Sequence, residues 1–225
     1  GGPDRAHKDF TPMQKAINYA MTSFFTTGGI RGGKKKMDKF YPRSFNMGVR
    51  REAYIALNGF SEMRFGEDID FSTRIFEHGY RCRLIPEAWV WHKRRTDLKK
   101  FFKQVYNSGI ARINLMKRHP GTLKLVHTLP AVFTLGCLLL VVLAAVAGVM
   151  GCPHWWVMLV PFVLFALIIF ADASRREQSI GVGLRAVAAA YIQLWGYGLG
   201  FWQAWWRRCV LGQGEFDAFR KNFYK

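Results

Sequence analysis

The stretch Phe65-Gly66-Glu67-Asp68-Ile69-Asp70-Phe71-Ser72-Thr73-Arg74 places three acidic residues at the start of a segment with helical spacing. Glu67 and Asp68 fall where a helix N-terminus favours negative charge, and Gly79 is a typical C-terminal stop. The apolar residues recur at the intervals of a buried helix face. The stretch therefore predicts an amphipathic helix over residues 67–78 that carries its acids in the first turn. Helix capping alone would also explain such a triplet.

The rest of the chain is both strongly basic and apolar. Its 225 residues carry a net charge of +18, and half of them are hydrophobic. Basic residues crowd the first 126 positions, and long uncharged runs follow. This pattern favours anionic lipid headgroups or phosphorylated substrates over nucleic acid, because the aromatic residues lie mostly in the apolar runs. The four cysteines form no C-x-x-C pair, which argues against a zinc site or a disulfide framework.

Around the acidic helix, the apolar spacing predicts short helices and strands. Helices are expected over residues 13–25, 51–57 and 98–116, and strands over 45–49, 81–85 and 88–92. Between the first helix and the first strand, residues 26–36 contain four glycines and four cations. Such a loop can wrap phosphate oxygens, although it lacks the G-x-x-x-x-G-K-[ST] spacing of a nucleotide P-loop. A solvated surface loop is the alternative.

Three apolar segments follow. Residues 129–150 are uncharged over about 33 Å of helix, which is enough to cross a bilayer core. Residues 153–171 form a second segment, and residues 186–206 form a third after a polar loop over 172–185. We therefore expect three units: residues 1–126, a transmembrane region over 127–206, and a basic tail over 207–225.

The basic residues flanking these segments predict the topology. They place the first 126 residues on the cytoplasmic side, because positive charge accumulates there. The third segment conflicts with this rule, since spanning would leave the basic tail outside. That segment is either re-entrant or interfacial, or the charge bias is overridden.

Several motifs follow one another in a fixed order. They read FNMGVRRE at 45–52, NGF at 58–60, GEDIDF at 66–71, GYR at 79–81 and PEAWVWH at 86–92. The series resembles family 2 glycosyltransferases, which have a GT-A nucleotide-sugar fold, and it covers roughly residues 1–120. The later part of the chain looks like membrane-bound, exopolysaccharide-type members similar to succinoglycan-biosynthesis transferases. The resemblance implies an α/β domain followed by transmembrane helices, in the bacterial inner membrane with the catalytic part in the cytoplasm.

The resemblance also implies roles for individual residues. Inverting sugar transfer needs a base for the acceptor hydroxyl and positive charge on the departing nucleoside diphosphate. The Asp of the family's Glu-Asp pair is the usual base, so Asp68 is expected to be the base and Glu67 to position it or the acceptor. Asp70 is expected to be structural. The expected acceptor or substrate-binding residues are Asn46, Gln104, Tyr106, Arg112, Arg31 and Lys34.

A divalent metal, Mg or Mn, is a further expectation from the resemblance. Asp68-Ile69-Asp70 spells D-x-D, but we reject it as the metal motif, because that motif belongs on a loop in the nucleotide-binding half. We expect the metal to be held mainly by that half, which this chain lacks as the C-terminal part of a longer protein, and we expect this part to be inactive alone. His92 is a candidate for an additional metal or phosphate contact; a satisfied histidine is the alternative.

The function expected from these features is membrane-anchored, inverting transfer of a sugar from a nucleotide-sugar donor. The acceptor would be lipid-linked or a growing polysaccharide in cell-envelope synthesis. Processive synthases carry Q-x-x-R-W, whereas residues 104–107 read QVYN, which favours the addition of one sugar per encounter. A processive synthase and a non-enzymatic, basic membrane-binding module are the alternatives.

Overall fold

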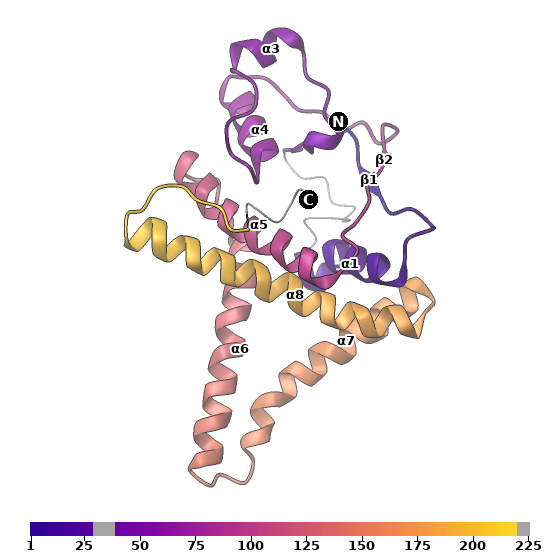
Figure 1. Cartoon of the computed structure of the whole chain (residues 1–225), viewed down its shortest axis with the longest axis vertical. Helices are drawn as coiled ribbons and strands as arrows, with labels where there is room; N and C mark the ends of the chain where they lie inside the picture. The colour runs from indigo at the N-terminus through magenta and orange to yellow at the C-terminus, as the bar shows by residue number, and fades with distance from the viewer. Residues whose placement is uncertain (29–38, 220–225) are drawn as a thin grey trace.

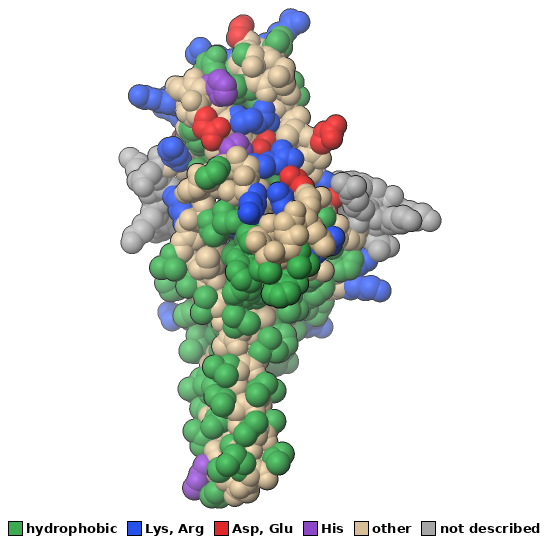
Figure 2. All heavy atoms as spheres, turned by 90° about the vertical axis from the view of Figure 1, so that its left-hand side faces the viewer, with side chains coloured by type: hydrophobic (Ala, Val, Ile, Leu, Met, Phe, Trp, Pro, Cys, Tyr) green, Lys and Arg blue, Asp and Glu red, His purple; other side chains and the backbone are tan. Residues whose placement is uncertain are grey.

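The computed structural model of the chain describes residues 1–28 and 39–219. Figure 1 shows an upper part, which contains the N-terminal half of the chain, above a long helical hairpin. A single long helix, α8, runs between these two parts. Charged side chains gather on the upper part, whereas hydrophobic side chains cover the hairpin along its length (Figure 2).

The upper part is mainly helical. It contains α1 (Pro12–Thr22), α2 (Phe24–Thr27), α3 (Arg51–Ala56), α4 (Glu67–Glu77) and α5 (Leu98–Arg118). Strands β1 (Asp4–Arg5) and β2 (Val90–Trp91) pair in parallel, and they form the only sheet among the described residues. The expected α/β fold is therefore present here only as this two-stranded pair.

Two predicted strands are wrong. Residues 45–49 were expected to be extended, but Ser44–Asn46 form the 3-10 turn η1. Residues 81–85 form no ladder, and the amide of Ile85 instead donates to the carbonyl of Gly1. A strand needs a neighbouring strand for its backbone groups, and neither segment has one in the described part of the chain.

The hairpin consists of α6 (Leu125–Val149), the 3-10 turn η2 (Trp155–Leu159) and α7 (Val160–Glu177). In the part of the chain that the structure describes, two helices are long and apolar enough to cross a membrane: Leu125–Val149 and Trp155–Glu177. Few of their side chains are buried inside the protein. The hairpin therefore presents an apolar surface that nothing else in the described chain covers.

The polar loop predicted over residues 172–185 is wrong. Helix α7 continues to Glu177 and ends at Gln178, which is left-handed with φ 51°. Helix α8 (Ile180–Trp205) begins directly afterwards, and the Ser179 hydroxyl accepts from the amide of Val182 as its N-cap. The polar residues lie on helix faces, so their polarity does not mark a break in the backbone.

The third apolar segment lies within α8, which crosses the hairpin instead of running alongside it (Figure 1). It is followed by a π-helical turn, η3 (Trp206–Val210). Helix α8 packs along α5, where glycines allow close contact. A Cβ at Gly109 would collide with the Tyr197 carbonyl, and one at Gly200 with the Tyr106 carbonyl. The third predicted segment thus lies in a helix that crosses the hairpin, and it is not among the two helices of the described residues that are long and apolar enough to span a membrane.

Helix α8 is also shared by two clusters of the core. In one cluster, Ala16 and Tyr19 of α1 pack with Ala173 of α7 and Ala186 of α8. In the other, Ile17 of α1 and Phe101 of α5 pack with Ala189 of α8. Helix α8 thus joins the hairpin to α1 and α5 of the upper part.

We predict that Gly109→Ala destabilises the protein, because the added methyl group must displace the α8 backbone at Tyr197. Overpacking of this kind costs about 1–3 kcal/mol, more than the gain in helix propensity. The measurement is thermal unfolding in detergent. Gly136→Ala on α6 is the matched control, because its Cβ meets nothing within 4 Å. Equal unfolding temperatures for both variants would contradict close packing of α5 on α8.

Candidate functional site

The two acids at the N-terminus of α4 are positioned by a glycine. Gly66 precedes the helix in the left-handed region, with φ 85°. A Cβ there would be strained, and it would lie 3.2 Å from the Leu115 side chain of α5. Gly66 therefore lets the start of α4 rest directly on α5. Glu67 and Asp68 follow in the first turn, where the helix dipole stabilises negative charge.

Asp68 is buried and has a cationic partner. Its Oδ2 lies 3.3 Å from Nη1 of Arg43, and its Oδ1 accepts from the amide of Ile69 at 2.8 Å. The side chain is 11% exposed, so a small part of the carboxylate faces solvent. Arg43 compensates the charge of this carboxylate and fixes its orientation.

Glu67 has a different environment, although it is adjacent in sequence. Its Oε1 accepts from the hydroxyl of Ser44 at 3.1 Å. Burial raises the pKa of Glu67, and the neighbouring charge of Asp68 raises it further. The site thus pairs a carboxylate beside an arginine with a second carboxyl group of raised proton affinity.

Asp70 is the centre of a buried ion-pair network, which we call the Asp70 network and define as Asp70, Arg74 and His119. Asp70 is 2% exposed. Its Oδ2 lies 3.0 Å from Nη2 of Arg74, and its Oδ1 lies 2.9 Å from Nε2 of His119. Arg74 also donates to the carbonyls of Leu57 at 2.6 Å and Gly59 at 2.7 Å. The network therefore ties α4 to the loop after α3 and to the end of α5.

The electrostatics of Asp70 follow from these contacts. Burial acts to raise its pKa, but the hydrogen bond with His119 and the charge of Arg74 outweigh burial, so the pKa is lowered. The other ring nitrogen of His119, Nδ1, lies 3.0 Å from Oε1 of Glu77. Asp70 is thus engaged in holding the helix in place.

The candidates Asn46 and His92 lie beside the β1–β2 pair. Asn46 donates from Nδ2 to the carbonyl of Ala88 at 2.8 Å. The His92 ring stacks on Phe45, and its Nδ1 lies 2.9 Å from Nη1 of Arg94. A guanidinium beside this nitrogen disfavours a metal ion there. No cluster of three or more metal-ligating side chains occurs in the described ranges 1–28 and 39–219, so these residues do not fit a metal site.

The candidates on α5 are spread along the helix. Gln104 accepts from Nε of Arg95 at 3.0 Å, and the Tyr106 ring packs against Phe219. Arg112 faces Tyr197 of α8, and its buried Nε has no hydrogen-bond partner among the described atoms. Arg31 and Lys34 lie outside the described residues. The structure thus brings Glu67 and Asp68 together, whereas Gln104, Tyr106 and Arg112 make separate contacts.

Sequence reasoning missed two residues of this site, Arg43 and Ser44. Both precede the FNMGVRRE motif, and each is more than twenty residues from its acidic partner. A cation and a hydroxyl in a loop carry no periodic signal. Only the fold brings them to α4.

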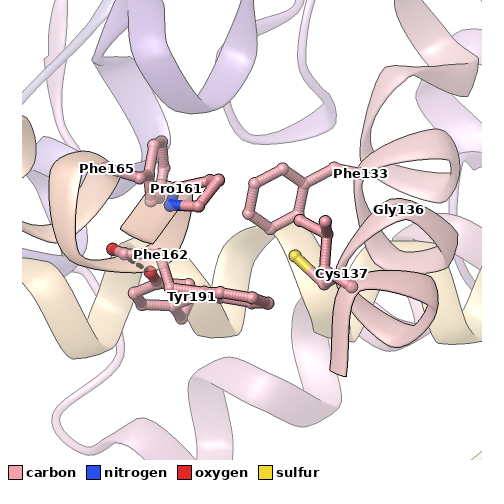
Figure 3. Close-up of a pocket in the computed structure, with 8 residues that line it drawn as sticks. Phe133, Gly136, Cys137, Pro161, Phe162, Phe165 and Tyr191 are labelled. Carbon is pink, nitrogen blue, oxygen red and sulfur yellow. Dashed lines mark hydrogen bonds between the residues drawn. The ribbon is translucent and has the colours of Figure 1, made fainter. Parts of the chain in front are cut away.

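A separate cavity lies in the hairpin, where α6 and α7 meet α8 (Figure 3). Its volume is about 220 Å³, and aromatic side chains, including Phe133, Phe165 and Tyr191, line it. The Tyr191 hydroxyl donates to the Phe162 carbonyl at 2.8 Å. This cavity is apolar and contains no carboxylate, so it is not a site for sugar chemistry.

Comparison with known proteins gives the family. Residues 44–169 match the family described as glycosyl transferase family group 2. The chain is also similar to the pre-mycofactocin glycosyltransferase of Mycobacterium tuberculosis, in strains CDC 1551 / Oshkosh and ATCC 25618 / H37Rv. Each comparison gives 33% identity over 103 residues, which is 45% of this chain and 21% of the relative. The chain thus spans about a fifth of the length of these curated relatives. No solved structure matches.

We predict that Asp70→Asn destabilises the protein by about 3–5 kcal/mol at pH 7, because it removes the buried charge that pairs with Arg74 and His119. The pKa of Asp70 is lowered on folding, so its stabilisation is complete above the ordinary aspartate value near 4 and is lost as the pH falls below it. The difference between wild type and variant should therefore shrink from pH 7 to about pH 3.

Thermal unfolding at several pH values measures this difference. The control is Glu87→Gln, because Glu87 is exposed. A difference that is small at pH 7, or that grows on acidification, would be inconsistent with a buried, charged Asp70.

Proposed function

The chain belongs to glycosyl transferase family group 2, and on that premise we propose that Asp68 is the general base of an inverting sugar transfer. The observation that supports the proposal best is the pair of unlike carboxyl groups at the start of α4. One is held by Arg43, and the other is hydrogen-bonded to Ser44. A buried, oriented carboxylate is the group that such a reaction needs to accept a proton.

The acceptor hydroxyl transfers its proton to the Asp68 carboxylate while its oxygen bonds to the anomeric carbon of the donor sugar. The bond from that carbon to the nucleoside diphosphate breaks, and the diphosphate leaves with the electron pair. Arg43 and the Ile69 amide hold the Asp68 carboxylate in place. Glu67, whose pKa is raised by burial, accepts from Ser44 beside this carboxylate and can accept a further hydrogen bond from a hydroxyl of the acceptor.

No step of the proposal passes through a metal. Members of the family commonly use a divalent ion, but the described residues offer no ligand set for it. The nucleotide-sugar donor is part of the proposal because sugar transfer requires an activated donor. Family membership favours the transferase over a non-enzymatic, basic membrane-binding module.

We also propose that the hairpin anchors the enzyme in the bacterial inner membrane and that the acceptor is lipid-linked. The exposed apolar surface of α6 and α7 supports two crossings. Helix α8 would then lie at the cytoplasmic interface, where Trp195, Trp205 and Trp206 are exposed. This arrangement keeps the basic residues after α8 on the cytoplasmic side and removes the conflict with the positive-inside rule. The missing Q-x-x-R-W motif supports single addition over processive synthesis.

The Asp68→Asn variant of the full-length protein should lose about 10²–10⁴-fold in transfer rate, because the amide cannot accept the proton. The assay follows label from a panel of nucleotide sugars into a lipid extract, in membranes. Asp9→Asn is the control, because Asp9 lies in a loop with its side chain 73% exposed. Near-normal transfer by Asp68→Asn would remove this residue from the mechanism.

Two native cysteines allow a test of the topology. Cys152 is exposed in the turn between the two hairpin helices, and Cys82 is half-buried in the upper part. In variants that keep one cysteine each, a membrane-impermeant maleimide should label Cys152 in intact spheroplasts. Cys82 should be labelled only after permeabilisation. Equal labelling of both in intact spheroplasts would refute two crossings.

A further inference from the structure

The chain folds back over α5 after α8 ends (Figure 1, yellow). We call residues 211–219 the C-terminal strap. The strap contains no helix or strand. Such a segment takes a defined place only if other groups satisfy its backbone. The strap lies beyond residues 44–169, which match the family.

Two buried asparagines of α5 hold the strap. Asn107 donates from Nδ2 to the carbonyl of Ala218 at 2.7 Å and accepts at Oδ1 from the amide of Ala218 at 2.9 Å. Asn114 donates from Nδ2 to the carbonyl of Phe216 at 3.1 Å. The two side chains are 1% and 3% exposed. Buried amides are costly unless they are paired, so α5 is built to hold this backbone.

Charged and aromatic contacts add to this attachment. Glu215 of the strap accepts from Nε of Arg118 at 2.8 Å. The Arg207 guanidinium lies 4.0 Å from the centre of the Phe216 ring. At the far end of the strap, Phe219 packs edge-on against Tyr106 of α5. The strap is therefore attached along its length.

The strap and the start of α4 contact one face of α5. Asn107, Ala111, Asn114 and Arg118 recur at intervals of three and four residues, which places them in one row. A Cβ on Gly66, at the start of α4, would lie 3.6 Å from Ala111, between the two asparagines. Arg118 also lies 3.7 Å from Asp70 of α4. The strap and the start of α4 thus rest on the same row of α5 residues.

We propose that the strap forms one wall of the acceptor site, and that Asn107 and Asn114 are positioning residues for the saccharide acceptor. A fixed wall on the same face of α5 as the start of α4 would restrict how the acceptor approaches and would align its hydroxyl with the base. The inference rests on the proposed function, because it needs Asp68 to mark the reacting centre. Tyr106, expected from the sequence to contact the acceptor directly, takes part in this wall through Phe219.

The test is transfer kinetics with Asn107→Ala in the full-length protein, in mixed micelles. Donor and total lipid extract, which serves as the acceptor probe, are varied separately. The half-saturating lipid concentration should rise about tenfold, the factor expected when a buried pair of hydrogen bonds is removed. The donor concentration at half-saturation and the maximal rate should stay within about twofold of wild type. Neither the Asn107 side chain nor the strap touches the reacting atoms.

Two further variants make the result specific. Ser108→Ala is the control, because Ser108 is exposed on the same helix and donates only to the Gln104 carbonyl of its own turn. Glu215→Gln weakens the contact of the strap with Arg118 and leaves the buried residues of α5 unchanged. It should also raise the half-saturating lipid concentration. It therefore decides the question if Asn107→Ala does not fold.

If Asn107→Ala reaches half-saturation at the same lipid concentration as Ser108→Ala, the positioning role is overturned. A fall in the maximal rate of Asn107→Ala without a change in that lipid concentration would overturn it as well. Wild-type protein that transfers no label would contradict the proposed function itself, and the acceptor wall with it.

Discussion

The Asp70 network is the interaction on which the arrangement of the upper part depends. Asp70 and Arg74 lie on α4, Arg74 reaches the carbonyls of the loop after α3, and His119 ends α5. One buried carboxylate thus joins three parts of the chain that local sequence does not bring together. Because the network fixes α4, it also fixes the two acids in the first turn. The charges that hold the helix are therefore separate from those that we assign to the reaction.

Helix α8 has the corresponding role between the upper part and the hairpin. It packs on α1, α5 and α7, and its glycines allow the α5 backbone to come close. As a result, α5, on which the start of α4 rests, also packs on α8. In the proposed membrane orientation, this places Asp68 near the lipid surface, where a lipid-linked acceptor would present its sugar. The strap would complete the site from the same helix.

Local patterns predicted the helices well, and long-range contacts decided the rest. The helices expected over 51–57, 67–78 and 98–116 are confirmed within a few residues, because each has an amphipathic face. The strands over 45–49 and 81–85 are wrong, since β-structure depends on a partner that propensity does not supply. The place of α8 could not be predicted either. Apolar composition does not distinguish a helix that packs across other helices of the protein from one that spans a membrane. Arg43 and Ala218 reach their partners from 25 and 111 residues away, without any motif.

The central claim is that Asp68 acts in the reaction, whereas Asp70 holds α4 in place. Its most direct test measures sugar transfer by Asp68→Asn and Asp70→Asn side by side, at a temperature where unfolding curves show both variants to be folded. We expect folded Asp68→Asn to lose about 10²–10⁴-fold in transfer rate and Asp70→Asn, although less stable, to keep most of its activity. The opposite result, with Asp68→Asn active and folded Asp70→Asn inactive, would contradict the account and make Asp70 the reacting carboxylate.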